Sequence, residues 1–194
     1  MFKKIVTTAL FTSTLLLAES GVGININEKD FEIEGVLDSR NLEALQTSST
    51  IFQIDANFLN VNETEKLIGI GIVATNKLEA VEGVELAFGA KGIWAEVGHD
   101  NFKALPFVAK VKYTLPPLMY KVPPVSLEGI GLYAPKVLSF GDSEEYTEFR
   151  LVANAEVIES VNVYAGYRNI HRTYKGVEQS LFNTGFYGGL KYVY

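Results

Sequence analysis

Two histidines are the residues of this chain best suited to acid–base chemistry near neutral pH, because the imidazole ring ordinarily titrates there. His99 is followed directly by Asp100, and His171 lies in a second polar segment. Ser139 and Asp142, in a third segment, are a hydroxyl and a carboxylate of the kind that a hydrolytic triad needs. Nothing in the spacing unites these groups. We therefore interpret both histidines as ordinary surface residues and predict no catalytic residue.

Metal and cofactor sites have little support in the sequence. His99, Asp100 and the acidic segment 141–145 (GDSEE) could gather a divalent cation, but a solvated acidic loop is the favoured interpretation. The glycine-rich segments 69–72 (GIGI) and 129–132 (GIGL) lack the Lys-Ser/Thr pair and the following helix that cradle a phosphate. The chain has no cysteine, which removes thiolate ligands and nucleophiles. We predict no metal and no cofactor.

The segments that carry these residues alternate apolar and polar side chains with a period of two, which is typical of β-strands. The clearest one is 146–157 (YTEFRLVANAEV). Phe149 and Leu151 share one face of it, while Glu148 and Arg150 share the other. A helix would scatter these charges around its circumference, so the spacing predicts a strand with one charged face.

Similar segments predict strands at 22–27, 31–38, 51–60, 66–75, 83–96, 103–115, 126–134, 146–157, 161–171 and 182–194. They make ten strands, or eight if the first two stay outside the sheet. Residues 39–50 predict a helical turn. The connections at 116–125 and 158–160 are predicted at one end of the sheet, and polar loops at 135–145 and 171–181 at the other. We expect a single domain over residues 21–194.

Three features favour a transmembrane barrel, in which the apolar face meets lipid, over a soluble one. The polar faces mix small residues with similar numbers of acids and bases. The chain ends on an aromatic residue, whereas the last residue of a soluble protein is usually frayed and polar. Aromatic residues also lie near predicted strand ends, as in interfacial girdles: Trp94, Tyr113, Tyr133, Tyr164, Tyr167, Tyr192 and Tyr194. We predict an all-β fold, a single antiparallel transmembrane β-barrel with ten strands favoured and eight possible.

Charged residues on the inward faces must pair, because an isolated charge in a narrow lumen loses its hydration. Glu32 and Asp55 lie on such polar faces. The candidates for lumen ion pairs are Glu85, Lys91, Lys110, Lys112, Glu148, Arg150, Glu156 and Arg168. We expect Arg150 or Arg168 to pair with Glu148 or Glu156 and to fill the lumen. A narrow polar path for ions is the alternative.

The first 20 residues (MFKKIVTTALFTSTLLLAES) have the cationic start, short apolar run and small closing residues of a secretory signal peptide. An uncleaved anchor helix is the alternative. However, a spanning helix needs about 20 consecutive apolar residues, and this run is shorter. We therefore predict a signal peptide over residues 1–20.

Three segments between Val81 and Ile170 carry a resemblance to a known family. They are VEGVELAFGAKGIW (81–94), ALPFVAKVKYTLP (104–116) and YAPKVLSFGDSEEYTEFRLVANAEVIESVNVYAGYRNI (133–170). In order and spacing they resemble the YfaZ family of outer-membrane proteins. The resemblance implies a small barrel in the outer membrane of a Gram-negative bacterium. It implies little about activity, because the function of that family is poorly defined.

These observations lead to one expected role and two alternatives. We expect a structural or surface-interaction barrel with a filled lumen, rather than an enzyme. A narrow channel for ions or small solutes, and a lipid-modifying enzyme that uses a histidine, are the alternatives. The expected partners are outer-membrane lipid and lipopolysaccharide, with the barrel-assembly machinery acting on the C-terminal strand that ends at Tyr194. Nucleic acid is not expected, because the net charge is −6.

Overall fold

The computed structural model describes residues 20–41, 50–62, 65–97, 100–116, 123–175 and 180–194. Apart from Ser20, the predicted signal peptide lies outside the described residues, and so does His99. Among the described residues, no helix is long and apolar enough to cross a membrane.

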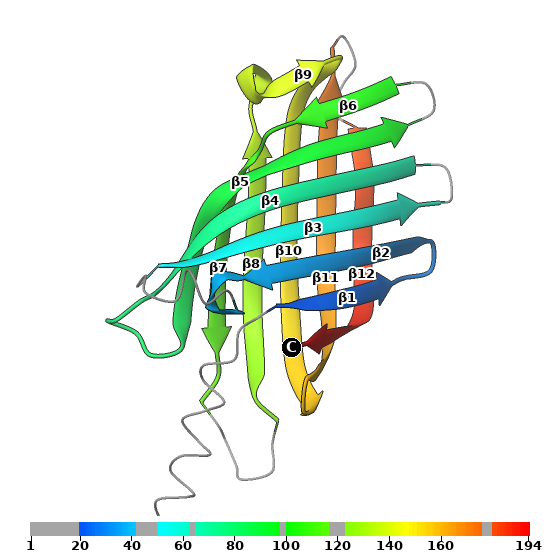
Figure 1. The fold of residues 1–194 in the computed structure, drawn as a ribbon. Helices are drawn as coiled ribbons and strands as arrows, with labels where there is room; N and C mark the ends of the chain where they lie inside the picture. Colours follow the sequence, from blue (N-terminus) through cyan, green and yellow to red (C-terminus); the bar gives the residue numbers. More distant parts are fainter. Residues whose placement is uncertain (1–19, 42–49, 63–64, 98–99, 117–122, 176–179) are drawn as a thin grey trace, which may run out of the picture.

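Ten antiparallel strands close into a barrel (Figure 1), which confirms the predicted fold and the larger of the two predicted strand numbers. Each wall strand pairs with the next one along the chain, and β1 pairs with β12, so the ring of pairings is complete. The wall strands are β1 (Gly21–Ile26), β2 (Asp30–Asp38), β3 (Ile51–Val61), β4 (Glu65–Lys77), β5 (Val84–Val97), β7 (Phe107–Thr114), β8 (Val125–Ala134), β10 (Ser143–Ile158), β11 (Val161–Tyr174) and β12 (Ser180–Val193).

Two short strands, β6 (Asp100–Ala104) and β9 (Ser139–Gly141), extend the wall at one end. β6 continues the register of β7 against β5, and the interruption falls at Leu105 and Pro106 because proline has no N–H for the ladder. The prediction that residues 135–145 form a polar loop is wrong in part. This segment contains the 3-10 helix η4 (Lys136–Leu138), β9 and the start of β10. Cross-strand partners at this rim supply backbone hydrogen bonds, which override the polar composition.

The two ends of the barrel carry different connections. The first residue of β1 and the last of β12 lie at what we call the termini end, together with the β4 to β5 and β10 to β11 connections. The opposite, hairpin end carries the β1 to β2 and β3 to β4 turns and the segment with η4 and β9 (Figure 1). The 3-10 helix η2 (Ser39–Asn41) starts the predicted helical turn at 39–50, and residues 42–49 lie outside the described residues. β11 runs to Tyr174 and β12 starts at Ser180, so the predicted loop at 171–181 is also partly strand.

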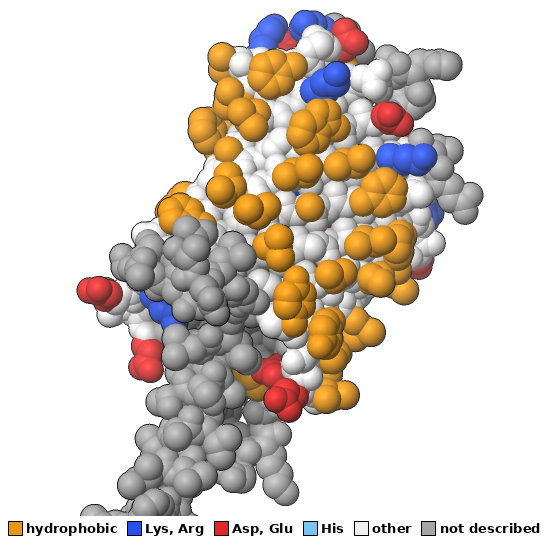
Figure 2. All heavy atoms as spheres, in the orientation of Figure 1, with side chains coloured by type: hydrophobic (Ala, Val, Ile, Leu, Met, Phe, Trp, Pro, Cys, Tyr) orange, Lys and Arg blue, Asp and Glu red, His pale blue; other side chains and the backbone are white. Residues whose placement is uncertain are grey.

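The outward face of the barrel is apolar over most of its height (Figure 2). In β1, Val22, Ile24 and Ile26 are half-exposed on the outside, whereas Gly23 and Asn25 are buried in the interior. Other exposed apolar side chains on this face include Phe88, Phe107, Phe149, Leu151, Phe186 and Leu190. This is the inside-out arrangement that the period-two pattern predicts.

Aromatic side chains follow the outward face toward the hairpin end: Phe31, Trp94, Phe107, Tyr133, Phe149, Tyr167 and Phe186. The rings of Tyr167 and Phe186 are in contact, with centroids 5.3 Å apart. Tyr164, predicted to belong to such a girdle, instead faces the interior and is only 4% exposed. It lies an even number of residues from Arg168, so alternation along β11 places both on the inward face.

An apolar core fills the half of the lumen toward the hairpin end: Leu59, Val61, Leu67, Ile93, Phe102, Val108, Leu132, Tyr146, Ile170 and Phe182 are among its members. Phe102 packs against Tyr146 and Tyr174, with ring centroids 5.8 and 5.7 Å apart. One ion pair, between Arg172 and Glu65 at 3.2 Å, lies beside this core, and Arg172 packs on the ring of Phe182. The predicted filling of the lumen by ion pairs is therefore replaced in this half by mainly apolar side chains. Near the hairpin end some strands carry apolar residues on both faces, as with Leu67 and Ile68 of β4, and the period-two contrast disappears.

Candidate functional site

A buried charge network centred on Glu32 crosses the lumen below the apolar core. Glu32 projects from β2, is 0% exposed, and binds two guanidinium groups from the far wall. Arg150 of β10 donates through Nη1 and Nη2, each at 3.0 Å, in a bidentate arrangement. Arg168 of β11 donates through Nη1. The Nδ2 groups of Asn25 and Asn57 donate to the same carboxylate at 3.0 and 2.7 Å.

Two further carboxylates neutralise the arginines. Arg150 Nε donates to Glu148, whose other oxygen accepts a hydrogen bond from the Tyr146 hydroxyl at 2.5 Å. Arg168 Nη2 lies 3.8 Å from Asp30. We call the following set the charged plug: Asn25, Asp30, Glu32, Asn57, Tyr146, Glu148, Arg150, Arg168 and Asn183.

Strand register explains why the plug needs a partner from across the barrel. Arg150 and Arg168 are directly opposite each other on β10 and β11, where like charges repel. Glu32 can reach both because a barrel of this size is narrow enough for side chains to fill. One carboxylate therefore bonds two adjacent guanidiniums and ties β2 to β10 and β11 across the lumen.

A second ion pair, between Lys91 of β5 and Asp55 of β3, passes over the intervening strand β4. That strand has Gly69 and Gly71 on its inward face at this level. A Cβ atom on Gly69 would lie 2.4 Å from Lys91 Cε and 2.3 Å from Asn57 Oδ1. The glycines of the GIGI segment thus leave room for side chains of the neighbouring strands.

We expect Gly69→Ala to break the Lys91–Asp55 ion pair and to destabilise the barrel by about 1–3 kcal/mol, as overpacking usually does. The measurement is the urea midpoint for unfolding of the protein in lipid vesicles. Gly131→Ala is the control, because a Cβ atom there would meet nothing within 4 Å. Equal midpoints for the two variants would contradict the packing role of Gly69.

Two tyrosines of β11 and β12 lie across glycines of the adjacent strand. Tyr164 is opposite Gly189, and Tyr187 is opposite Gly166. A Cβ atom on Gly189 or Gly166 would lie 2.5 or 2.6 Å from Cζ of the facing tyrosine. The Tyr187 ring also lies beneath the plug, with its centroid 5.2 Å from Cζ of Arg168. Sequence reasoning missed these pairs, although the alternation of tyrosine and glycine in both strands was a usable signal.

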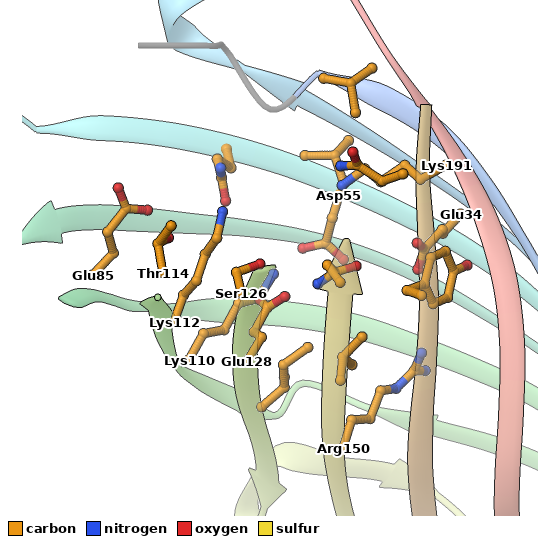
Figure 3. Close-up of a pocket in the computed structure, with 18 of the residues that line it drawn as sticks. Glu34, Asp55, Glu85, Lys110, Lys112, Thr114, Ser126, Glu128, Arg150 and Lys191 are labelled. Carbon is orange, nitrogen blue, oxygen red and sulfur yellow. The ribbon is translucent and has the colours of Figure 1, made fainter. Parts of the chain in front are cut away.

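Below the plug, toward the termini end, the lumen contains a cavity of about 810 Å³ lined by charged, polar and apolar side chains. Glu148 and Arg150 line its inner end, and Lys77, Glu82 and Tyr194 line it near the rim. Figure 3 shows charged side chains of several strands pointing into this space. The cavity therefore extends from the plug to the termini end, and the plug and the apolar core separate it from the hairpin end.

A ladder of alternating charges crosses one wall of the cavity. Lys77, Glu85, Lys112 and Glu128 occupy directly opposed positions on β4, β5, β7 and β8. Lys77 Nζ lies 4.0 Å from the Glu85 carboxylate. Opposite charges at directly opposed positions attract, so this ladder is balanced within itself.

The structure places the predicted lumen residues on the inward face in several groups. The plug contains Glu148, Arg150 and Arg168; the ladder contains Glu85 and Lys112; Lys91 pairs with Asp55; and Lys110 and Glu156 line the cavity.

Glu32 was not among the ion-pair candidates. Its partners Arg150 and Arg168 are 118 and 136 residues away in the chain, so the sole sequence signal was its place on the polar face of 31–38. Glu156, considered as a partner for either arginine, lies near the end of β10 and forms no ion pair with them among the described residues.

The groups considered for catalysis or metal binding lie apart in role and position. His171 of β11 is opposite Thr147 of β10. Ser139 belongs to β9, and Asp142 is exposed just before β10 begins. No hydrogen bond between described residues joins His171 to Ser139 or Asp142. Within the described part of the chain, no group of three or more His, Asp or Glu side chains could hold a metal ion.

A closed antiparallel barrel with an apolar outward face and a charged plug across its lumen belongs to the class of small transmembrane β-barrels. This chain is a member of the YfaZ family: residues 4–194 match the family described as YfaZ precursor, which confirms the resemblance. None of the curated proteins compared with the chain matches it significantly. A solved bacterial polysaccharide outer membrane secretin is similar, with a TM-score of 0.46 and 8% identity, over 90% of this chain and 69% of that one.

Proposed function

We propose that this protein is a closed barrel of the outer membrane of a Gram-negative bacterium, with a structural or surface-interaction role and no enzymatic activity. The observation that carries the proposal is the double closure of the lumen. A solute crossing it would have to displace Glu32 from Arg150 and Arg168 and then pass the apolar core around Phe102 and Tyr146. An ion that enters the apolar core loses its hydration, which is costly. The charged plug and the apolar core are therefore two successive barriers to a solute.

The outward face supports the membrane location. Hydrocarbon offers no partner to an unpaired backbone group, and the complete ring of pairings meets that requirement. The belt of exposed aliphatic and aromatic side chains would contact lipid and lipopolysaccharide. The assembly machinery would act on β12, beside Tyr194. In this arrangement the termini end faces the periplasm and the hairpin end faces outward.

The absence of enzymatic activity in the proposal is supported by the position of the candidate groups. His171 points away from the lumen, and its neighbours across the sheet are Thr147 and Leu181, which offer no carboxylate to orient an imidazole. Loss of both histidines should therefore leave lipid composition unchanged in cells that carry the double variant.

Recording in planar lipid bilayers tests the closure, because a channel is the main alternative. We expect no discrete conductance steps from the wild-type protein. Arg150→Ala should also remain silent, since the apolar core still closes the lumen above the altered plug. A general porin recorded in the same bilayers is the positive control. Steady steps of one size from the wild type, altered in Arg150→Ala, would establish the channel instead.

A further inference from the structure

Several charged side chains in the cavity form no hydrogen bond or short ion pair with the residues that the structure describes. Lys110, Lys191, Glu34 and Glu156 line the cavity and are partly exposed. None of them forms a hydrogen bond or ion pair through its side chain with another described residue. The nearby ladder and the Lys91–Asp55 pair are, by contrast, balanced. A half-buried charge without a protein partner must be satisfied by whatever occupies the cavity.

The unpartnered charges approach the cavity from two sides and carry both signs. Lys191 and Glu34 flank Gly23 of β1, and a Cβ atom there would lie 2.7 Å from Glu34 Oε1, so the carboxylate lies over the glycine. Lys110 comes from β7 and is opposite the apolar Ile130 of β8. Figure 3 shows Glu34 and Lys191 on one side of the cavity and Lys110 on the other. The contents of the cavity therefore meet ammonium and carboxylate groups together.

We propose that the cavity is a binding site for small zwitterionic solutes of short-peptide size that enter from the termini end. Its volume of about 810 Å³ falls in the range of about 300–1,000 Å³ usual for small-molecule sites. A solute of one sign could form ion pairs with only half of these charges, and a neutral one could offer them hydrogen bonds alone, whereas a zwitterion can form ion pairs with both signs. The inference rests on the proposed closure of the lumen, because an open lumen would make the cavity part of a passage.

Calorimetric titration of the full mature barrel in detergent micelles tests this proposal with dialanine as the probe. We expect saturable binding at one site. N-acetylalanine methylamide, which has a similar size and no charge, should bind at least about tenfold more weakly, because it leaves the charged groups unpaired. Lys110→Met and Glu34→Gln should each weaken dialanine binding by about tenfold or more.

Lys103→Met is the matched control, because Lys103 is exposed at the hairpin end and lies outside the cavity. Heat-modifiable gel mobility verifies that every variant is folded. Equal binding of the uncharged analogue, binding of inorganic phosphate alone, or no saturable heat would overturn the proposal. Unchanged affinity in both cavity variants would do the same. Conductance is measured separately, so a silent barrel that binds no dialanine contradicts this inference alone, and a conducting barrel contradicts the proposed function.

Discussion

Replacing Glu32 with alanine is expected to lower the free energy of unfolding by about 3–5 kcal/mol, the usual effect of removing one partner from a buried ion pair. The variant keeps Arg150 and Arg168 directly opposite each other and removes the carboxylate that bonds both. Glu148 still pairs with Arg150, but the remaining carboxylate beside Arg168 is that of Asp30, 3.8 Å away. Two adjacent buried guanidiniums are then poorly compensated, and their repulsion favours the unfolded chain.

Urea-dependent unfolding in lipid vesicles measures this effect through the fluorescence of Trp94, the single tryptophan of the chain, which is 46% exposed on the outward face. Glu34→Ala is the matched control. It lies on the same strand, two residues away, and makes no ion pair among the described residues, so its change should stay within about 0.5 kcal/mol. Adding Arg168→Met to Glu32→Ala should recover part of the loss, because one of the two uncompensated charges is gone. Equal stability of the Glu32 and Glu34 variants would show that the plug does not hold the barrel.

Placing arginine at Ile72 should impair insertion and destabilise the inserted barrel by about 2–4 kcal/mol, the range found for cations near the middle of the lipid-facing belt. Ile72 is 53% exposed, and its cross-strand neighbours Ile54 and Ala90 also face outward. A guanidinium there would lose its hydration with no carboxylate at hand. In a soluble barrel the same surface would be wet, and the substitution would have almost no effect.

Cell fractionation and gel mobility report the outcome for Ile72→Arg. The wild type should be recovered in the outer-membrane fraction as a heat-modifiable species, and the variant should show a reduced folded fraction there. Asn76→Arg is the control on the same strand and the same face, because Asn76 is exposed near the termini end of β4, where arginine can reach the headgroups. If the wild type appears in the soluble fraction, or if Ile72→Arg folds and inserts like Asn76→Arg, the outward face does not meet lipid.

Much of the fold is local in origin and was therefore predictable. Side chains two residues apart lie on one face of a strand, so the spacing of Glu148 and Arg150 placed both on the inward side, while Phe149 and Leu151 faced outward. The same alternation indicated ten strand segments, and turn residues and prolines marked where they end. The rims were less predictable, because polar residues there join strands once neighbouring backbones supply hydrogen bonds.

The sequence by itself favoured ten strands over eight, and its alternation indicated the inside-out arrangement and the charges on the inward face. The tertiary structure alone decided that Glu32 bonds Arg150 and Arg168, that Lys91 crosses Gly69 to reach Asp55, and that an apolar core closes the hairpin half. Those contacts join strands that are not neighbours in the sheet, and they depend on how strand tilt and stagger bring opposite walls to the same height. The local alternation fixes the face on which each side chain lies, but the partner across the lumen depends on the register and stagger of distant strands, which no local pattern in the chain specifies.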